Sequence, residues 1–310
     1  HRLAYGLGPT RPGHAGAGMQ DRERWRITLC PGLSVLVVQA IGAVASGSLA
    51  LLADTVHVFA DVFGVFLALV AITLAARPTK QRRTFGLYRL EILATVANGL
   101  LLLGLSVFIL VEAYERWFDP KPIDAPVMLL AAVFGLVANC IGVWLLRRGA
   151  KDSLAVRGAY LEVMSDALGS VGVIAAAIVL MTTGWEQVDS LVSLAIALFI
   201  IPRTLLLLRD AFSILMESAP TGVDLDEIRA HMAKVPGVVA IHDLHVWTIT
   251  SGMPSLSAHV TVEPNPFVDG SGERVLDELK DCLHDCFEIG HTTFQLESVE
   301  HSAQEDVQHP

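Results

Sequence analysis

Two ionisable side chains stand four residues apart in the middle of a long apolar stretch. In the segment "LLADTVHVFAD", residues 51–61, His57 and Asp61 fall on one face of a helix, so an imidazole nitrogen and a carboxylate oxygen can converge on one point. An ionisable group at membrane depth is costly and therefore faces a bundle interior, where it is a candidate for function. Taken alone, the pair also fits a structural hydrogen bond.

A second apolar stretch repeats this spacing. The segment "AYLEVMSDALGSVGVI", residues 159–174, places Glu162 and Asp166 four residues apart and follows them with small, glycine-containing sequence. Two helices that each offer two ligands can surround a divalent cation tetrahedrally, and Zn²⁺ accepts a mixture of imidazole and carboxylate ligands. The sequence therefore predicts an intramembrane metal site made of His57, Asp61, Glu162 and Asp166.

Asp54 lies three residues before His57, nearer the start of the same stretch. Two interpretations are open for it. The carboxylate either lines a path by which a proton or an ion leaves the site, or it caps the start of the helix at a water-filled vestibule.

The elements that must position these side chains are long apolar segments. The chain of 310 residues is 53% hydrophobic and 17% charged, with a mean hydropathy of +0.53, which is too apolar for an ordinary soluble protein of this length. Six runs are long enough to cross about 30 Å of hydrocarbon, and they lie at residues 28–46, 48–76, 88–113, 125–147, 158–182 and 188–208. We expect an α-helical polytopic membrane protein with six transmembrane helices.

Basic residues gather in alternate connections. Lys and Arg are concentrated before the first run, between the second and third, between the fourth and fifth, and after the sixth, whereas the other connections hold almost none. By the positive-inside rule both termini are cytoplasmic. The short connections and the compact C-terminal part fit the plasma (inner) membrane of a bacterium.

From Asp210 onward the chain changes character. Helical and alternating segments follow one another in the order α-β-β-α-β, which predicts a ferredoxin-like α+β domain. This part carries 18 acidic and four basic residues, and its acidic surface argues against nucleic acid as a partner. The predicted divisions are a disordered N-terminal tail, a six-helix membrane domain, a C-terminal domain and a short final tail, at residues 1–27, 28–208, 209–301 and 302–310.

The four cysteines are too few and too scattered for a disulfide framework, and we expect them to be reduced. They are Cys30, Cys140, Cys282 and Cys286. Cys282 and Cys286 are four residues apart on a predicted helix with His284 between them, so they fit either a metal site or helix packing. We favour helix packing.

Four segments together resemble the cation diffusion facilitator family. They are "LLADTVHVFAD", "TFGLYRLEILATVANG", "VRGAYLEVMSDALGSVGVI" and "VVAIHDLHVWTITSGMPSLSAHV", and the similarity extends from about Leu29 to Glu297. The resemblance implies a homodimeric exporter of Zn²⁺ and related divalent cations that is driven by proton exchange, with six helices in the lipid bilayer and a cytoplasmic metallochaperone-like domain. It also implies that the second and fifth helices supply the ligands, which here are His57, Asp61, Glu162 and Asp166.

The chain departs from the family pattern at Glu162, where zinc-transporting members usually have histidine. A third carboxylate makes the site harder and more negative, which favours Mn²⁺, Fe²⁺ or Co²⁺ relative to a two-histidine site, so these ions and Cd²⁺ are alternatives to Zn²⁺. Three carboxylates this close cannot all be ionised in an empty site, so metal entry is expected to expel protons. Protons are therefore the expected counter-ion.

The resemblance further implies a metal site in the C-terminal domain near a dimer interface. The matching positions are His242, His259 and Glu297, with His291 close by. Strand alternation puts His242 and Asp243 on opposite faces, so the fold must bring separate strands together to form a cluster. Each histidine taken singly fits an ordinary surface or interface position equally well.

Two other functions fit parts of the pattern. An intramembrane metallohydrolase would also place His, Asp and Glu around a metal, but the chain has no HExxH motif and no obvious base beside the ligands. A membrane-anchored metal sensor would use the C-terminal domain, but six spans and an ionisable quartet are costly features for an anchor. We therefore expect a secondary active transporter without catalytic residues.

Overall fold

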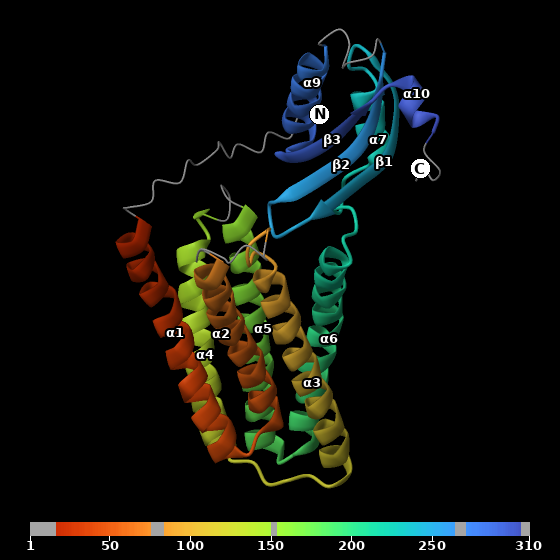
Figure 1. Cartoon of the computed structure of the whole chain (residues 1–310). Helices are drawn as coiled ribbons and strands as arrows, with labels where there is room; N and C mark the ends of the chain where they lie inside the picture. The colour runs from red at the N-terminus through yellow and green to blue at the C-terminus, as the bar shows by residue number, and fades with distance from the viewer. Residues whose placement is uncertain (1–16, 76–83, 150–153, 264–270, 305–310) are drawn as a thin grey trace. The chain divides into compact units, whose positions relative to one another are not determined.

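The computed structural model of the chain describes residues 17–75, 84–149, 154–263 and 271–304 (Figure 1). Its first part consists of long helices: α1 Ala17–Ser46, α2 Leu49–Ala75, α3 Leu90–Phe118, α4 Ala125–Leu146, α5 Leu154–Thr183 and α6 Gln187–Leu215. Five of them, α2 to α6, are long and apolar enough to cross a membrane, and the apolar part described for α1, Gly32–Ser46, is shorter. The predicted α-helical polytopic membrane fold is confirmed.

Two helices extend beyond the boundaries that hydropathy suggested. α1 begins at Ala17, inside the predicted tail of residues 1–27, and α6 continues to Leu215, past residue 208. Hydropathy marks only the apolar part of a helix, whereas polar residues such as Glu, Gln and Arg also favour the helical backbone and can prolong it. The rest of the predicted N-terminal tail and the last six residues of the chain lie outside the described residues.

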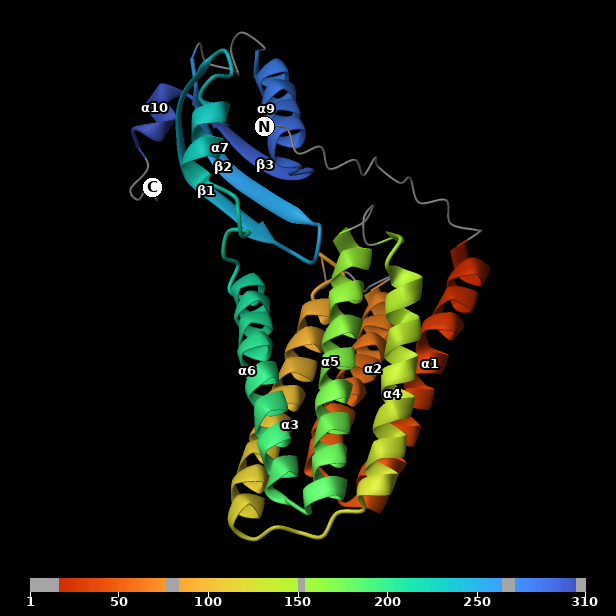
Figure 2. The same cartoon turned by 180° about the vertical axis from the view of Figure 1, so that it is seen from behind.

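The chain forms two compact units, one from the residues up to Phe63 together with Leu102–Ile201, the other from Gly64–Leu101 together with the residues from Pro202 onward. In the first unit α5 packs along α4, and α4 packs along α1 (Figure 2). At Gly42 in α1 an added Cβ would collide with the Cβ of Ala131 in α4. Small residues therefore let these helices approach closely, as is common in membrane bundles.

The start of α2 is fixed by a side chain from α6. Asp189, which is 1% exposed, accepts hydrogen bonds from the hydroxyl of Ser48 at 2.6 Å and from the backbone N–H groups of Leu49 and Ala50 at 2.7 and 3.1 Å. The first N–H groups of a helix have no partner within the helix, so this carboxylate acts as a cap supplied from another helix.

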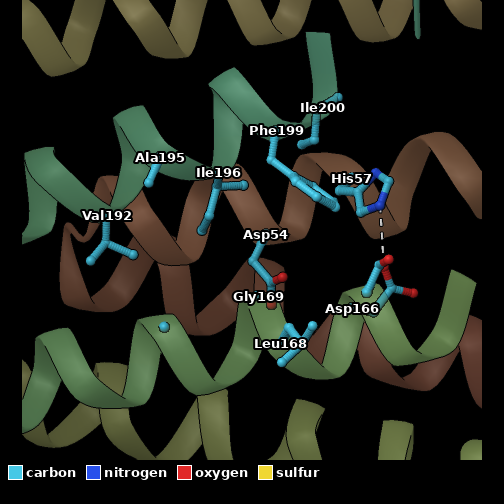
Figure 3. A pocket seen from close by; sticks show the side chains of 12 residues that line it. Asp54, His57, Asp166, Leu168, Gly169, Val192, Ala195, Ile196, Phe199 and Ile200 are labelled. Atoms are coloured by element: carbon cyan, nitrogen blue, oxygen red, sulfur yellow. Dashed lines mark ion pairs between the residues drawn. The ribbon is translucent and has the colours of Figure 1, made fainter. Parts of the chain in front are cut away.

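A cavity of about 350 Å³ lies between α2, α5 and α6 (Figure 3). Most of its lining is apolar, and its ionisable lining residues are Asp54, His57 and Asp166. The two helices that carry the predicted ligands, α2 and α5, therefore face each other across a space that admits small polar species.

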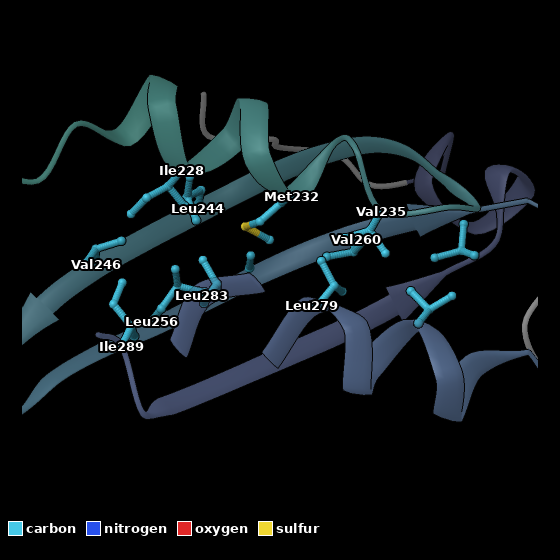
Figure 4. Packing of buried hydrophobic residues seen from close by; sticks show 13 residues of the cluster. Ile228, Met232, Val235, Leu244, Val246, Leu256, Val260, Leu279, Leu283 and Ile289 are labelled. Atoms are coloured by element: carbon cyan, nitrogen blue, oxygen red, sulfur yellow. The ribbon is translucent and has the colours of Figure 1, made fainter. Parts of the chain in front are cut away.

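The C-terminal domain has the predicted α-β-β-α-β order with one short helix added. Its elements are α7 Leu225–Met232, β1 Val238–Thr248, β2 Pro254–Val262, α9 Gly272–Phe287, β3 His291–Glu297 and α10 Val299–Ser302. β2 is the central strand, antiparallel to β1 and parallel to β3. Apolar residues of α7 and α9, such as Met232 and Leu279, pack with strand residues such as Val260 into one core (Figure 4).

Candidate metal centres

The four residues predicted as intramembrane ligands converge in the first unit. Nε2 of His57 lies 3.1 Å from Oδ1 of Asp166, 3.9 Å from Oε1 of Glu162 and 4.0 Å from Oδ2 of Asp61. Ligand atoms of His57, Asp61 and Glu162 also lie within 4.8 Å of one another, which is close enough for a shared metal ion. The i, i+4 spacing on α2 and α5 thus brings two pairs of ligand side chains to one point, as the sequence predicted.

The quartet has a buried side and a more open side. The side chains of His57 and Asp166 are both 11% exposed, whereas those of Glu162 and Asp61 are 29% and 36% exposed. One imidazole and three carboxylates offer a donor set that suits Zn²⁺ and also harder divalent cations. The arrangement can therefore hold a cation between the two helices with two ligands still accessible from outside the core.

Asp54 does not cap α2, because it lies inside the helix, whose first N–H groups bond to Asp189 and to the hydroxyl of Ser48. Asp54 is 2% exposed, and its Oδ2 accepts hydrogen bonds from Nε2 of Gln39 in α1 at 2.7 Å and from the hydroxyl of Ser170 in α5 at 3.3 Å. Neither Gln39 nor Ser170 was singled out from the sequence, since a contact between distant helices leaves no local pattern. The capping interpretation of Asp54 is therefore wrong, and a place on a proton or ion path stays a prediction.

A second cluster lies in the C-terminal domain, where ligand atoms of His242, Asp243 and His259 are within 4.8 Å of one another. Glu297 completes it: its Oε1 lies 2.9 Å from Nδ1 of His259 and its Oε2 lies 3.4 Å from Nε2 of His242. Gln295 Nε2 donates a hydrogen bond to Glu297 at 2.7 Å and holds this 1% exposed carboxylate in place. Three of the four predicted C-terminal residues are thus brought together.

Asp243 joins this cluster because β1 is irregular there. The pairing of β1 with β2 shifts between His242 and His245, and Asp243 has a φ of 46°, so the strict alternation that would place His242 and Asp243 on opposite faces is interrupted. No residue pattern in β1 indicates this bulge. His291 pairs with Ser255, whereas His259 pairs with Gln295, so His291 lies at the opposite end of β3 from the cluster.

The cysteines Cys140, Cys282 and Cys286 are free. Partial burial, with a further contribution from Cys286, raises the pKa of the Cys282 thiol above its usual value. A thiol must lose its proton to bind a metal, so this environment disfavours ligation by Cys282. Cys30 lies among residues whose side chains are not described.

Long apolar helices that carry a His–carboxylate cluster, joined to an α/β domain with a second such cluster, define a polytopic membrane protein suited to divalent cations. Comparison with known families gives a more specific assignment. Residues 27–216 match the model of the cation efflux transmembrane domain, and residues 220–299 match that of the cation efflux protein cytoplasmic domain. The chain belongs to the cation efflux, or cation diffusion facilitator, family.

Curated relatives agree with this assignment over nearly the whole chain. The metal cation efflux system protein CzcD of Cupriavidus metallidurans is 43% identical over 298 residues, covering 96% of this chain and 92% of that protein. The cadmium, cobalt and zinc/H(+)-K(+) antiporter of Bacillus subtilis is 38% identical, covering 86% of each chain. The zinc transporter ZitB of Escherichia coli is 37% identical, covering 90% of this chain and 88% of that protein.

A solved structure also matches part of the chain. It is the metal-bound C-terminal domain of the CzcD transporter from Cupriavidus metallidurans, which is 44% identical and covers 24% of this chain and 99% of that chain, with a TM-score of 0.22. Membership of the family, carried by the sequence matches, identifies this multi-pass membrane protein as a transporter of divalent metal cations and not an enzyme.

Proposed function

We propose that this chain is a proton-coupled antiporter that exports a divalent cation, foremost Zn²⁺, from the cytoplasm through its membrane quartet. The observation that carries the proposal is the convergence of one oxygen from each of three carboxylates on Nε2 of His57, at 3.1–4.0 Å, from two facing helices. The ligands assigned to the transported ion are His57, Asp61, Glu162 and Asp166.

The names of the relatives and the donor set together support the choice of Zn²⁺. Zinc, cadmium and cobalt appear in the names of two transporters that resemble this chain. The single imidazole suits these ions, while the carboxylate at Glu162 keeps Mn²⁺ and Fe²⁺ as alternative substrates. The substrate is therefore tested as a series of ions.

Proton coupling follows from competition for the same atoms. A carboxylate or an imidazole must be free of its proton to bind a metal, so metal entry releases protons and proton entry releases metal. If the site opens alternately to each side of the membrane, this competition exchanges M²⁺ for H⁺. A proton gradient can then drive metal export without any chemical step.

The remaining assignments extend the same proposal. Residues 28–208 form the transport domain in a bacterial inner membrane, with both termini in the cytoplasm, and residues 209–301 form a domain through which two chains dimerise. The dimer also involves the membrane domain. The cluster of His242, Asp243, His259 and Glu297 is proposed as a regulatory metal site on the cytoplasmic side; its compact geometry supports this role.

The test is metal-driven proton flux in vesicles that contain the purified chain and a pH-sensitive dye. Zn²⁺, Cd²⁺, Co²⁺, Fe²⁺ and Mn²⁺ are compared, and Asp61→Ala is expected to abolish the flux. Asp277→Ala, which removes an exposed aspartate of α9, is the matched control and should transport normally. A rate of metal transport that does not change when a pH gradient is imposed would refute the antiport mechanism.

The same experiment separates the transporter from the alternative of a membrane-anchored metal sensor. If no ion produces flux while the chain still binds metal through His242 and its neighbours, the sensor becomes the better description. The compact second cluster is the observation that supports the metal sensor as an alternative.

A further inference from the structure

The imidazole of His57 presents only one of its two nitrogens to the quartet. Nε2 faces the three carboxylates, whereas Nδ1 is buried and has no hydrogen-bond partner within the described part of the chain. The whole residue is 9% exposed. A histidine that ligates a metal almost always donates its second N–H to a carboxylate, a carbonyl or a water, because this bond fixes both the tautomer and the ring orientation.

Asp54 is held so that one of its two oxygens is in use. Both hydrogen bonds that it accepts, from Gln39 and Ser170, go to Oδ2. Oδ1 instead faces Gly169 of α5, where an added Cβ would lie only 2.9 Å away. Glycine at this position therefore leaves space beside Oδ1.

Asp54 and His57 both line the cavity between α2, α5 and α6. Asp54 and His57 are three residues apart on α2, and both line the cavity and extend toward α5 (Figure 3). Its volume of about 350 Å³ is ample for water, which occupies roughly 30 Å³ per molecule in the liquid. Because Nδ1 is buried, the imidazole must turn slightly toward the cavity before a water there can accept its hydrogen bond and donate one to Asp54.

We propose that Asp54 is the positioning carboxylate of His57: a water in the cavity accepts the hydrogen bond of His57 Nδ1–H and donates one to Asp54 Oδ1. The pair fixes the tautomer in which Nε2 keeps its lone pair for the transported metal. The inference rests on the proposed function, since it concerns how the quartet is prepared to bind its cation.

The hydrogen bonds to Oδ2 contribute to this arrangement by orienting the carboxylate. Gln39 and Ser170 approach from α1 and α5, so Asp54 is held from two helices while Oδ1 stays directed into the space beside Gly169. Asp54 itself is not a ligand in this scheme. Its effect reaches the metal only through the imidazole of His57, and this dependence makes the idea testable.

The first experiment measures the Zn²⁺ concentration that gives half-maximal flux in vesicles. Asp54→Asn is expected to raise it about 10–100-fold, which is the usual effect of removing an outer partner of a metal-ligating histidine. Ser170→Ala removes a hydrogen bond to Oδ2 and leaves Oδ1 and the charge in place, so its effect should stay under about tenfold. Equal effects of the two variants would mean that Asp54 only holds α2 and α5 together, and this result would overturn the proposal.

The second experiment repeats Asp54→Asn in a His57→Asp background. An aspartate ligand has no tautomer to fix, so the effect of Asp54→Asn should disappear there, whereas a purely structural role predicts the same loss in both backgrounds. If the His57→Asp chain gives no flux, the ¹⁵N shifts of the His57 imidazole, measured in native and Asp54→Asn chains by solid-state NMR in vesicles, decide alone. Unchanged Nδ1 and Nε2 shifts would overturn the proposal.

These outcomes are separable from failure of the proposed function. A native chain that moves no metal contradicts the transporter assignment, and the imidazole shifts then still test the pairing of Asp54 with His57. A native chain that transports Zn²⁺ but tolerates Asp54→Asn within about twofold contradicts this inference alone.

Discussion

Removal of the carboxylate that caps α2 should destabilise the membrane domain. Asp189→Ala leaves three donors without their acceptor, namely the hydroxyl of Ser48 and the N–H groups of Leu49 and Ala50. Hydrogen bonds between membrane helices contribute about 0.6 kcal/mol on average, and an unsatisfied buried donor in a protein core costs roughly 1–3 kcal/mol. For three donors around a 1% exposed side chain we expect a loss of about 2–4 kcal/mol in the free energy of unfolding.

The assay is reversible unfolding of the purified chain in mixed micelles, followed by helical circular dichroism. Ser48→Ala removes one of the three donors and also the oxygen that accepts from the N–H of Leu51 at 3.0 Å, and it should cost about 1 kcal/mol. Asp189→Asn is the matched control: it retains an oxygen for Ser48 and Ala50, so it should lose less stability than Asp189→Ala. If Asp189→Ala costs no more stability than Ser48→Ala, the start of α2 does not depend on the carboxylate.

Three further predictions concern other parts of the chain. Gly42→Leu should lower the stability of the membrane domain by about 1–3 kcal/mol because a side chain there collides with Ala131, and unfolding in micelles measures the loss. His242→Ala should reduce the metal bound per chain by one ion, measured by elemental analysis, with flux retained; an unchanged metal content would contradict the second site. Cys282 should be alkylated more slowly than the exposed Cys286 at pH 7, and the difference should shrink as the pH rises toward the raised pKa of Cys282, which peptide mass spectrometry can follow.

Local patterns predict the membrane fold and the candidate ligand pairs. Hydropathy over about 20 residues marks a span, and the i, i+4 spacing of His57 with Asp61 and of Glu162 with Asp166 puts each pair on one helix face. Ionisable groups are costly in lipid, so both helix faces must turn toward the bundle interior. The two pairs are therefore expected to lie close together. Spans and ligand faces can be predicted without knowing which helices are neighbours.

Long-range contacts and backbone irregularities were not predictable in this way. Asp189 caps a helix that begins 140 residues earlier, and Gln39 reaches Asp54 from a different helix, so neither partner has a neighbour in sequence that indicates its role. Asp243 entered the C-terminal cluster through a bulge in β1, which alternation cannot foresee. His291 was placed near that cluster from its position in the chain, whereas strand register puts it at the other end of β3.

The position of Glu162 within the quartet explains how one substitution could alter selectivity without harming the fold. His57 and Asp166 form the buried side of the site, and Glu162 lies on its open side with 29% of its side chain exposed. Glu162→His should therefore leave stability within about 0.5 kcal/mol of the native chain, as for most partly exposed positions, while it replaces a hard oxygen donor by a nitrogen. The expected result is a rise in flux for Zn²⁺ relative to Mn²⁺ and Fe²⁺ in the vesicle assay. An unchanged ion preference would show that the buried pair, His57 and Asp166, sets selectivity and that Glu162 serves another step, such as proton release.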